Sequence, residues 1–273
     1  RQLVKMGHEV HVLTSNYPRG ERMEVVDGIT VERVRCLARP LRNPISPEML
    51  SIGDRLDDYD LVHTHNEHSF AAMLSSLFKR RSEMPLVLTC HGQLRFGVPA
   101  FDFFERIYSR WMGRAIIGST DTVVVLSEAD RSYISSLCQE KRIEVIPNAV
   151  DTDELRSLSS SVNGIARDKY QLKGRTIALF VGQVIKRKGV EHLIRSIKIV
   201  RNELGANDLV CAIVGSGDYL KEAKQLAKDL HVDDQVIFTG RVSSDELISF
   251  YKESDFLVLP SFSEGMPTTI IEA

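Results

Sequence analysis

Two glutamates near the C-terminal end of the chain flank a segment that could bind an anion. The segment reads SEGMPTTIIEA over 263–273 and follows a predicted strand at 255–260. Pro267 suits the first turn of a helix, because the N–H that proline lacks would be unpaired there anyway. We therefore expect a helix that begins at about Met266, with an N-terminus fitted to a diphosphate.

The predicted anion site consists of amide N–H groups in that first turn, those of Met266, Thr268 and Thr269. Gly265 would allow a ligand to approach the backbone closely. Glu264 precedes the site, and Glu272 lies about one and a half turns into the helix. Carboxylates next to phosphates are tolerated when hydroxyl groups lie between, so this pair could bind the two sugars that flank a diphosphate. The alternative is a surface helix with a glutamate at its favourable N-terminus.

The elements that must position these residues alternate along the chain. Predicted strands lie at 9–14, 29–34, 60–64, 86–90, 121–126, 143–146, 176–182, 209–215, 235–240 and 255–260, with helices between most of them. A polar, serine-rich stretch without apolar periodicity interrupts the pattern at 151–164. We therefore predict a domain of residues 1–155 and a second domain of residues 156–273.

Alternating strands and helices predict an α/β fold with parallel sheets. A (β/α)8 barrel also alternates, but a polar break in its middle is not expected. Two facing Rossmann-like, doubly wound domains fit better, and ligands of such domains bind beyond the carboxyl ends of the strands. The chain begins and ends inside predicted helices, so we expect an incomplete fold that lacks its first strand and loop and part of its second domain. We expect this fragment to be inactive.

Composition excludes several classes of protein. The chain has 273 residues, of which 43% are hydrophobic and 26% charged, and its net charge of -2 gives no basic footprint for nucleic acid. The four cysteines are widely spaced, which disfavours disulfides and a zinc site and favours a cytoplasmic location. No apolar run approaches the roughly 18 to 20 residues of a membrane span.

Several short motifs together resemble one family of enzymes. Glu264 and Glu272 form a Glu-x7-Glu pattern after SFSEG. GQVIKRKG at 182–189 is similar to the basic glycine loop of that family, and the other matching segments are VIPNAVD at 145–151, TCHG at 89–92 and GHEVHVLT at 7–14. Over nearly its whole length, the chain resembles the retaining glycosyltransferases of family 4 (glycosyl transferases group 1), which have the GT-B fold.

The resemblance implies roles for particular residues. Lys188 would neutralise a leaving diphosphate, Glu264 would hold hydroxyls of the donor sugar, and His91 would lie near the C6 hydroxyl of that sugar. Without the family context, His91 would be read as a loop histidine that caps backbone. The implied donor-binding residues are Gly182, Arg187, Gly265, Met266, Thr268, Thr269 and Glu272, the last of which would hold the ribose diol. Gln183 departs from the family, which usually has an arginine there.

The implied reaction transfers a hexose from a UDP- or GDP-linked donor to a hydroxyl of a sugar or lipid-linked acceptor, with retention. Cations and helix N–H groups would stabilise the departing diphosphate, so neither a metal nor a cofactor is implied. Alternatives are a non-catalytic relative that binds sugar nucleotides, which Gln183 favours, and a GT-B nucleotide-sugar epimerase. A glycogen-type phosphorylase would need a lysine for pyridoxal phosphate, and the second domain shows no such context.

Other features have weaker support. Asp151 and Asp153 resemble a metal-binding Asp-x-Asp pair, but Asp151 directly precedes a helix-forming segment, so a capping role is favoured. His63 and His65 alternate on a predicted strand, and only Glu67 follows as a third possible metal ligand. GSGDY at 215–219 lacks the full dinucleotide fingerprint and would border a nucleotide pocket.

The segment 101–118 predicts a helix with an unusual pattern. Arg106, Arg110 and Arg114 repeat every four residues beside Phe103, Phe104, Ile107 and Trp111. The favoured interpretation is an aromatic stripe that faces the core beside a solvated basic edge. The alternative is peripheral contact with an anionic membrane surface.

Overall fold

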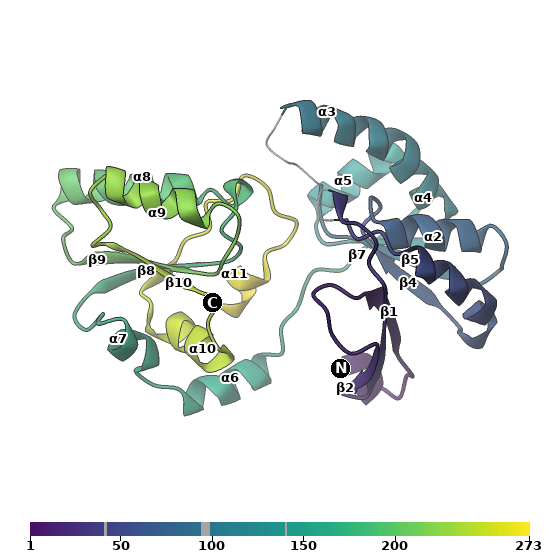
Figure 1. The fold of residues 1–273 in the computed structure, drawn as a ribbon, viewed down its shortest axis with the longest axis horizontal. Coiled ribbons are helices and arrows are strands. Elements are labelled where there is room, and N and C mark those ends of the chain that lie inside the picture. Colours follow the sequence, from purple (N-terminus) through teal and green to yellow (C-terminus); the bar gives the residue numbers. More distant parts are fainter. Residues whose placement is uncertain (41–42, 94–98, 140) are drawn as a thin grey trace. The chain divides into compact units, whose positions relative to one another are not determined.

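The computed structural model describes residues 1–40, 43–93, 99–139 and 141–273, and Figure 1 shows their ribbon. The chain forms two compact units. Unit 1 consists of Arg1–Gly92 and Phe103–Ile146, and unit 2 of Gln93–Asp102 and Pro147–Ala273. The chain passes from unit 1 to unit 2 after Ile146, nine residues before the end of the first predicted domain. None of the helices formed by the described residues combines the length and apolar character that a bilayer span requires.

Unit 1 contains two sheets that are not hydrogen-bonded to each other. The strands are β1 (His11–Ser15), β2 (Met23–Val26), β3 (Ile29–Val34), β4 (Val62–His65), β5 (Leu86–Cys90), β6 (Thr122–Val125) and β7 (Arg142–Val145). A parallel sheet has the order β4-β5-β6-β7, and a smaller sheet has the order β1-β3-β2. Strand β2 pairs with β3 in antiparallel fashion, which the sequence analysis did not predict. Four of the six predicted strands of this unit shift by up to two residues, and 29–34 and 86–90 have the predicted bounds.

Unit 1 also contains several helical segments. They are α1 (Gln2–Lys5), η2 (Pro47–Asp58), α2 (Phe70–Lys79), α3 (Pro99–Tyr108), η3 (Ser109–Gly113), α4 (Arg114–Ser119) and α5 (Glu128–Leu137), and η3 is a π-helical turn between α3 and α4. Apolar side chains of α2, α4 and α5 pack with Leu88, Val123 and Val125 of the sheet. The predicted aromatic stripe does not face this core: Phe103, Phe104, Ile107 and Trp111 are exposed.

Unit 2 is a doubly wound parallel sheet with the strand order β10-β9-β8-β11. Its strands are β8 (Thr176–Val181), β9 (Leu209–Val214), β10 (Val236–Gly240) and β11 (Phe256–Leu257), and its helices are α6 (Thr152–Ser161), α7 (Ile165–Lys169), η4 (Lys186–Lys188), α8 (Val190–Leu204), α9 (Leu220–Asp229), α10 (Ser244–Glu253) and α11 (Thr268–Glu272). Figure 1 shows α8 and α9 on one face of the sheet and α7 and α10 on the other. The fold class therefore agrees with the prediction.

Strand β9 explains why both faces are covered. All six of its residues are buried. Cys211 and Ile213 pack with α8 and α9, whereas Val210 and Ala212 pack on the opposite face with Phe250 of α10. Successive side chains of a strand point to opposite faces, so a continuous apolar run requires helices on both.

The polar stretch 151–164, which lacks apolar periodicity, is mostly helical. Helix α6 covers Thr152–Ser161. The side chain of Asp151 accepts a hydrogen bond from the Glu154 amide at 3.1 Å, so the predicted capping role is confirmed. Helix α6 has no fully buried residue, so its sequence shows no apolar periodicity.

The turn from η4 into α8 depends on Gly189. Its φ is +68°, and an added Cβ would lie 2.1 Å from the carbonyl oxygen of Pro260. Gly205, at the end of α8, has a similar φ of +65°, but an added Cβ would meet nothing within 4 Å. The two glycines therefore have the same left-handed backbone conformation, but of the two only Gly189 lies against the backbone of another loop.

We predict that Gly189→Ala lowers the free energy of unfolding more than Gly205→Ala. The control carries only the cost of a left-handed alanine, about 1–2 kcal/mol. The backbone overlap adds roughly 1–3 kcal/mol at Gly189. Denaturant unfolding followed by circular dichroism measures both, and equal losses would show that the approach of the two loops is not constrained at this position.

Candidate donor-binding site

The site of unit 2 begins in the loop that follows β8. This loop enters the short 3-10 turn η4, whose residues Lys186, Arg187 and Lys188 are all basic. Strand β11 is the neighbour of β8 in the sheet, so the loops that follow the two strands meet at the same edge. The amide of Phe262, in the loop after β11, donates to the Arg187 carbonyl at 3.0 Å. The two loops are therefore joined through their backbones.

Three charged side chains link these loops. The Lys188 Nζ donates to Oε1 of Glu264 at 2.5 Å, and Arg187 Nη1 lies 3.8 Å from Oε2 of the same carboxylate. The Arg187 side chain also donates to the Ser263 carbonyl at 2.5 Å. The side chains of Lys188 and Glu264 are only 16% and 20% exposed, so the pair is shielded from most solvent. Two cations thus face one carboxylate, which leaves positive charge available to a ligand.

Helix α11 begins later than the sequence analysis predicted. Its first residue is Thr268, with Pro267 as N-cap, rather than Met266. Proline therefore stands just before the first helical residue. Within the described part of the chain, no acceptor is found for the amides of Met266, Thr268 or Thr269. The predicted anion-binding donors are thus available, although they belong to a loop and a short helix.

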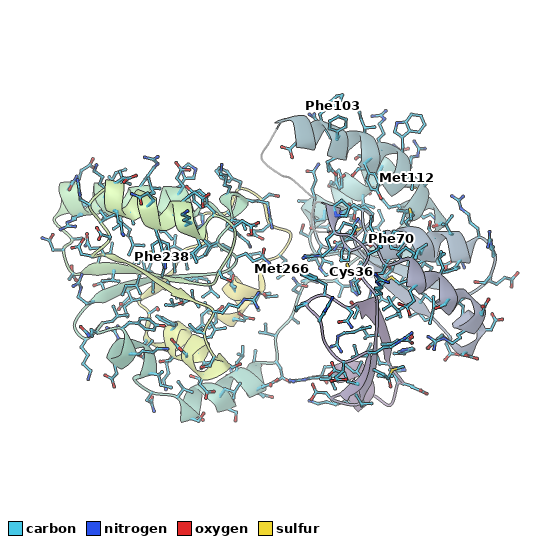
Figure 2. The ribbon with its side chains drawn as sticks, in the orientation of Figure 1. Cys36, Phe70, Phe103, Met112, Phe238 and Met266 are labelled. Atoms are coloured by element: carbon cyan, nitrogen blue, oxygen red, sulfur yellow. The ribbon has the colours of Figure 1, made fainter. Side chains whose placement is uncertain are left out.

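The loop before α11 has a further support that the sequence analysis missed. Asn148 Nδ2 donates to the carbonyl oxygen of Met266 at 2.7 Å, and Met266 is labelled in Figure 2. Asn148 lies within VIPNAVD, a segment that had been used only as a motif. A side-chain amide that binds a main-chain carbonyl turns that peptide unit, so Asn148 orients the backbone beside Glu264 and Gly265.

Glu272 is also held in place. Its Oε2 accepts a hydrogen bond from the hydroxyl of Tyr251 on α10 at 2.7 Å. Burial and the neighbouring carboxylate raise the pKa of Tyr251, so the tyrosine stays protonated and remains a donor. The other oxygen of Glu272 can still accept hydrogen bonds. Tyr251 was not predicted as a site residue, because nothing in its sequence context marks it.

The loop after β9 packs tightly on the loop after β8. An added Cβ at Gly217 would lie 2.4 Å from the Val184 carbonyl oxygen, and the Val184 amide donates to the Ser216 carbonyl at 3.1 Å. The Gly182 amide is used as well, since it donates to the Val214 carbonyl at 3.0 Å. GSGDY therefore shapes the loop that carries the predicted site. Gln183 in the same loop is exposed.

The predicted site residue of unit 1 belongs to a row of histidines. His91 directly follows β5, and its Nε2 lies 3.0 Å from Nδ1 of His65 on β4. His63 is next in the row, with its ring centroid 4.6 Å from that of His65 and its Nε2 2.7 Å from the Thr89 hydroxyl. The His91 ring thus contacts a second imidazole rather than capping backbone.

The three rings resist protonation. Desolvation lowers the pKa of His65 to about 4, and the other two histidines act in the same direction. Desolvation also lowers the pKa values of His63 and His91, although the charge of Glu67 opposes this at His91. At neutral pH all three imidazoles are therefore neutral, and His91 can make a polar contact without carrying a positive charge.

The metal alternative finds no support in the positions of the side chains. Glu67, the third possible ligand, is 1% exposed and turned into the interior. Among the described residues, His, Cys, Asp and Glu side chains form no group of three or more placed to hold a metal ion.

Comparison with known proteins identifies the family. Residues 1–154 match the model described as Glycosyltransferase Family 4, and residues 163–273 match Glycosyl transferases group 1. The chain belongs to glycosyltransferase family 4. This agrees with the resemblance in its motifs, and it places the basic loop and the Glu-x7-Glu segment in the second matched region.

Relatives of this family 4 member include proteins of stated activity. A glycosyltransferase of Methanocaldococcus jannaschii is 28% identical over 99% of this chain and 70% of its own length. A GDP-mannose-dependent phosphatidylinositol monomannoside mannosyltransferase of Mycobacterium tuberculosis is 32% identical over 56% of this chain and 39% of its own length. The alpha-monoglucosyldiacylglycerol synthase of Streptococcus pneumoniae is 24% identical over all of this chain and 63% of its own length.

Solved structures share the fold. Sucrose-phosphate synthase from Thermosynechococcus elongatus has a TM-score of 0.74 at 19% identity and covers 99% of this chain and 70% of its own. HepE of Anabaena in complex with UDP-glucose has a TM-score of 0.69 at 18% identity and covers 90% of this chain and 65% of its own. At these identities the similarity shows the GT-B fold of the family 4 chain.

The histidine row predicts a pH dependence of stability. The folded-state pKa values lie below the ordinary value of about 6.5, so the folded chain binds fewer protons than the unfolded chain in acid. The free energy of unfolding should therefore fall as the pH drops below about 6.5. The contribution of His65 to this loss should continue until the pH reaches its folded-state pKa of about 4. The variant His65→Asn should lose less stability over this range, whereas His8→Asn, at an exposed position, should behave like the parent.

Unfolding by urea at pH 7, 5.5 and 4.5 measures this effect. Carboxylates titrate in every variant, so the comparison between variants isolates the histidine. Identical losses in the parent and in His65→Asn would contradict the argument.

Proposed function

We propose that this chain binds a UDP- or GDP-linked hexose and transfers the sugar to a hydroxyl acceptor with retention, without a metal or cofactor. The observation that carries the proposal is the arrangement of Lys188, Arg187 and Glu264 between two loops at the carboxyl end of a parallel sheet. Ligands of doubly wound sheets bind at this end. Cations that face a carboxylate suit a ligand that has both phosphates and hydroxyls.

The cations would stabilise the leaving group. Breaking the bond between sugar and phosphate builds negative charge on the departing nucleoside diphosphate. Lys188 and Arg187 lie where they can meet this charge, and the amides of Met266, Thr268 and Thr269 can donate to phosphate oxygens. These donors are held in position before the reaction, so little reorganisation is needed.

The two glutamates would hold the sugars on either side of the diphosphate. Glu264 would exchange its contact with Lys188 for hydroxyls of the donor sugar. Glu272 would keep its hydrogen bond from Tyr251 and accept the ribose diol with its second oxygen. Neutral His91 would contact the C6 hydroxyl. Gly182 and Gly265 would let the nucleotide approach the backbone.

Retention would follow if the acceptor hydroxyl attacks from the face that the diphosphate leaves. A diphosphate oxygen would then take the proton of the acceptor. This route needs no protein nucleophile, and the residues assigned to the site supply cations, amides and carboxylates for binding and charge stabilisation. The GDP-mannose-dependent and glucosyl-transferring relatives support a nucleotide-linked hexose as donor, and their lipid substrates favour a lipid-linked acceptor.

A second function is a non-catalytic protein that binds sugar nucleotides. Gln183 favours it, because a neutral amide cannot replace the charge-assisted bond of an arginine, worth about 1.5–3 kcal/mol. Such a protein would bind the donor but release no nucleoside diphosphate when supplied with acceptors.

We predict that Lys188→Ala and Glu264→Ala each lower the release of nucleoside diphosphate by about 100-fold or more. The assay screens a panel of donors with the complete protein and a set of sugar and lipid acceptors. Lys221→Ala and Glu222→Ala change the same residue types at exposed positions of α9 and should retain full activity. Unchanged release in both site variants would refute the assignment.

Binding of free UDP and GDP distinguishes the role of Lys188 at the diphosphate from the role of Glu264 at the sugar. Calorimetry should show weaker nucleotide binding in Lys188→Ala, because the lysine meets the diphosphate. Glu264→Ala should bind the free nucleotide as well as the parent, because its carboxylate is assigned to the sugar. Equal weakening in both would mean that Glu264 acts by positioning Lys188 rather than by holding the sugar.

A further inference from the structure

The helix formed by α3, η3 and α4 exposes large apolar side chains. Phe103 is 56% exposed, Phe104 66%, Ile107 44% and Trp111 75%. Phe103 is labelled on this helix in Figure 2. The spacing of three to four residues places these side chains on one side of the helix. Exposure of single apolar residues is ordinary, but a contiguous row of this kind marks an interaction surface.

The opposite side of the same helix shows that the exposure is not an accident of packing. Glu105 is 8% exposed and Ser109 is 2% exposed, and the Ser109 hydroxyl donates to the Glu105 carboxylate at 2.5 Å. Gly113 is buried as well, and an added Cβ would lie 3.6 Å from Glu67. The helix therefore turns small and polar residues toward the interior. Rotation of the helix to bury its aromatic residues would expose Glu105, Ser109 and Gly113 in their place.

The π-helical turn Ser109–Gly113 lies at the centre of this arrangement. Such turns are rare and occur often at functional sites. Here the turn carries Trp111, the most exposed of the four apolar side chains, together with Arg110. The exposed row thus includes the part of the helix whose backbone is least regular.

Arginines accompany the apolar row. Arg110 and Arg114 are exposed and lie three residues after Ile107 and Trp111, so each stands one turn from an apolar side chain. Within the residues that the structure describes, neither arginine forms an ion pair. Arg106 extends the series by one turn toward the N-terminal end.

We propose that this face, formed by Phe103, Phe104, Ile107, Trp111, Arg110 and Arg114, docks on an anionic lipid membrane. Phenylalanine and tryptophan enter the boundary between headgroups and acyl chains, and adjacent arginines bind lipid phosphates. A protein partner would need acidic groups to match the arginines, whereas an anionic bilayer presents such charge everywhere. Docking would bring a lipid-linked acceptor to unit 1, but the membrane contact itself does not depend on the proposed transferase activity.

Vesicle flotation without any donor tests the docking directly. The protein should float with vesicles of phosphatidylcholine that contain 30% phosphatidylglycerol, and poorly with phosphatidylcholine alone. Phe104→Ser with Trp111→Ser, and separately Arg110→Gln with Arg114→Gln, should each reduce the bound fraction by about tenfold or more. The matched controls Leu204→Ser and Arg156→Gln change exposed residues of unit 2 and should bind like the parent.

Fluorescence gives a second readout. Trp111 is the single tryptophan among the 273 residues, so its emission reports on this face. Anionic vesicles should shift the emission to shorter wavelength, and lipids brominated near the headgroup should quench it. Circular dichroism of each variant shows whether the fold is retained.

Several outcomes would overturn the proposal. They are absence of flotation by the parent, equal flotation by all variants, and flotation without a shift in Trp111 emission. A change of oligomeric state in the Phe104→Ser, Trp111→Ser variant, without vesicle binding by the parent, would instead assign the face to contacts between copies. A protein that does not bind vesicles but fully transfers sugar to a water-soluble acceptor would contradict the docking and leave the proposed function intact. A protein that binds vesicles but transfers no sugar would contradict the proposed function and leave the docking intact.

Discussion

The candidate site of unit 2 depends on the contact between the loops that follow β8 and β11. The two strands are neighbours, so their carboxyl ends lie together at one edge of the sheet. Gly189 lets the first loop reach the Pro260 backbone, and the Lys188–Glu264 pair then joins the loops through charge. A side chain at Gly189 would separate the loops, and the lysine would lose its contact with the carboxylate of Glu264.

Much of unit 2 could be predicted because its central strands β8 and β9 are buried on both faces. An apolar run such as Leu209–Val214 cannot lie on a surface, and helix α10 has a serine cap and an acidic first turn that are visible in the sequence. The candidate site residues Lys188 and Glu264 could be predicted because ligands of such sheets bind at the loops that follow the strands. Asn148 and Tyr251 were missed because they act through single hydrogen bonds between elements distant in sequence, which leave no local pattern.

Periodicity failed where a helix has more than one possible orientation. The spacing of Phe103, Ile107 and Trp111 showed that they share a side, but it could not show which side faces the core. The burial of Glu105, Ser109 and Gly113, the last of them next to Glu67, shows which side faces the interior, and that packing is a property of the folded structure. For helix α6, periodicity gave no signal because the helix has no buried residue, and only the cap at Asp151 marks its start in the sequence.

The position of Glu264 follows from electrostatics. A carboxylate next to a diphosphate is repelled, so a site that needs carboxylates for sugar hydroxyls must supply cations close to them. Lys188 and Arg187 neutralise Glu264, which would otherwise be an unpaired, partly buried charge. A diphosphate would compete for the same cations, and the carboxylate would then need hydroxyl donors in their place. Under the proposed function, a nucleotide sugar would supply both groups in one molecule, whereas inorganic diphosphate would supply only the first, so the ion pair would favour the sugar-linked ligand.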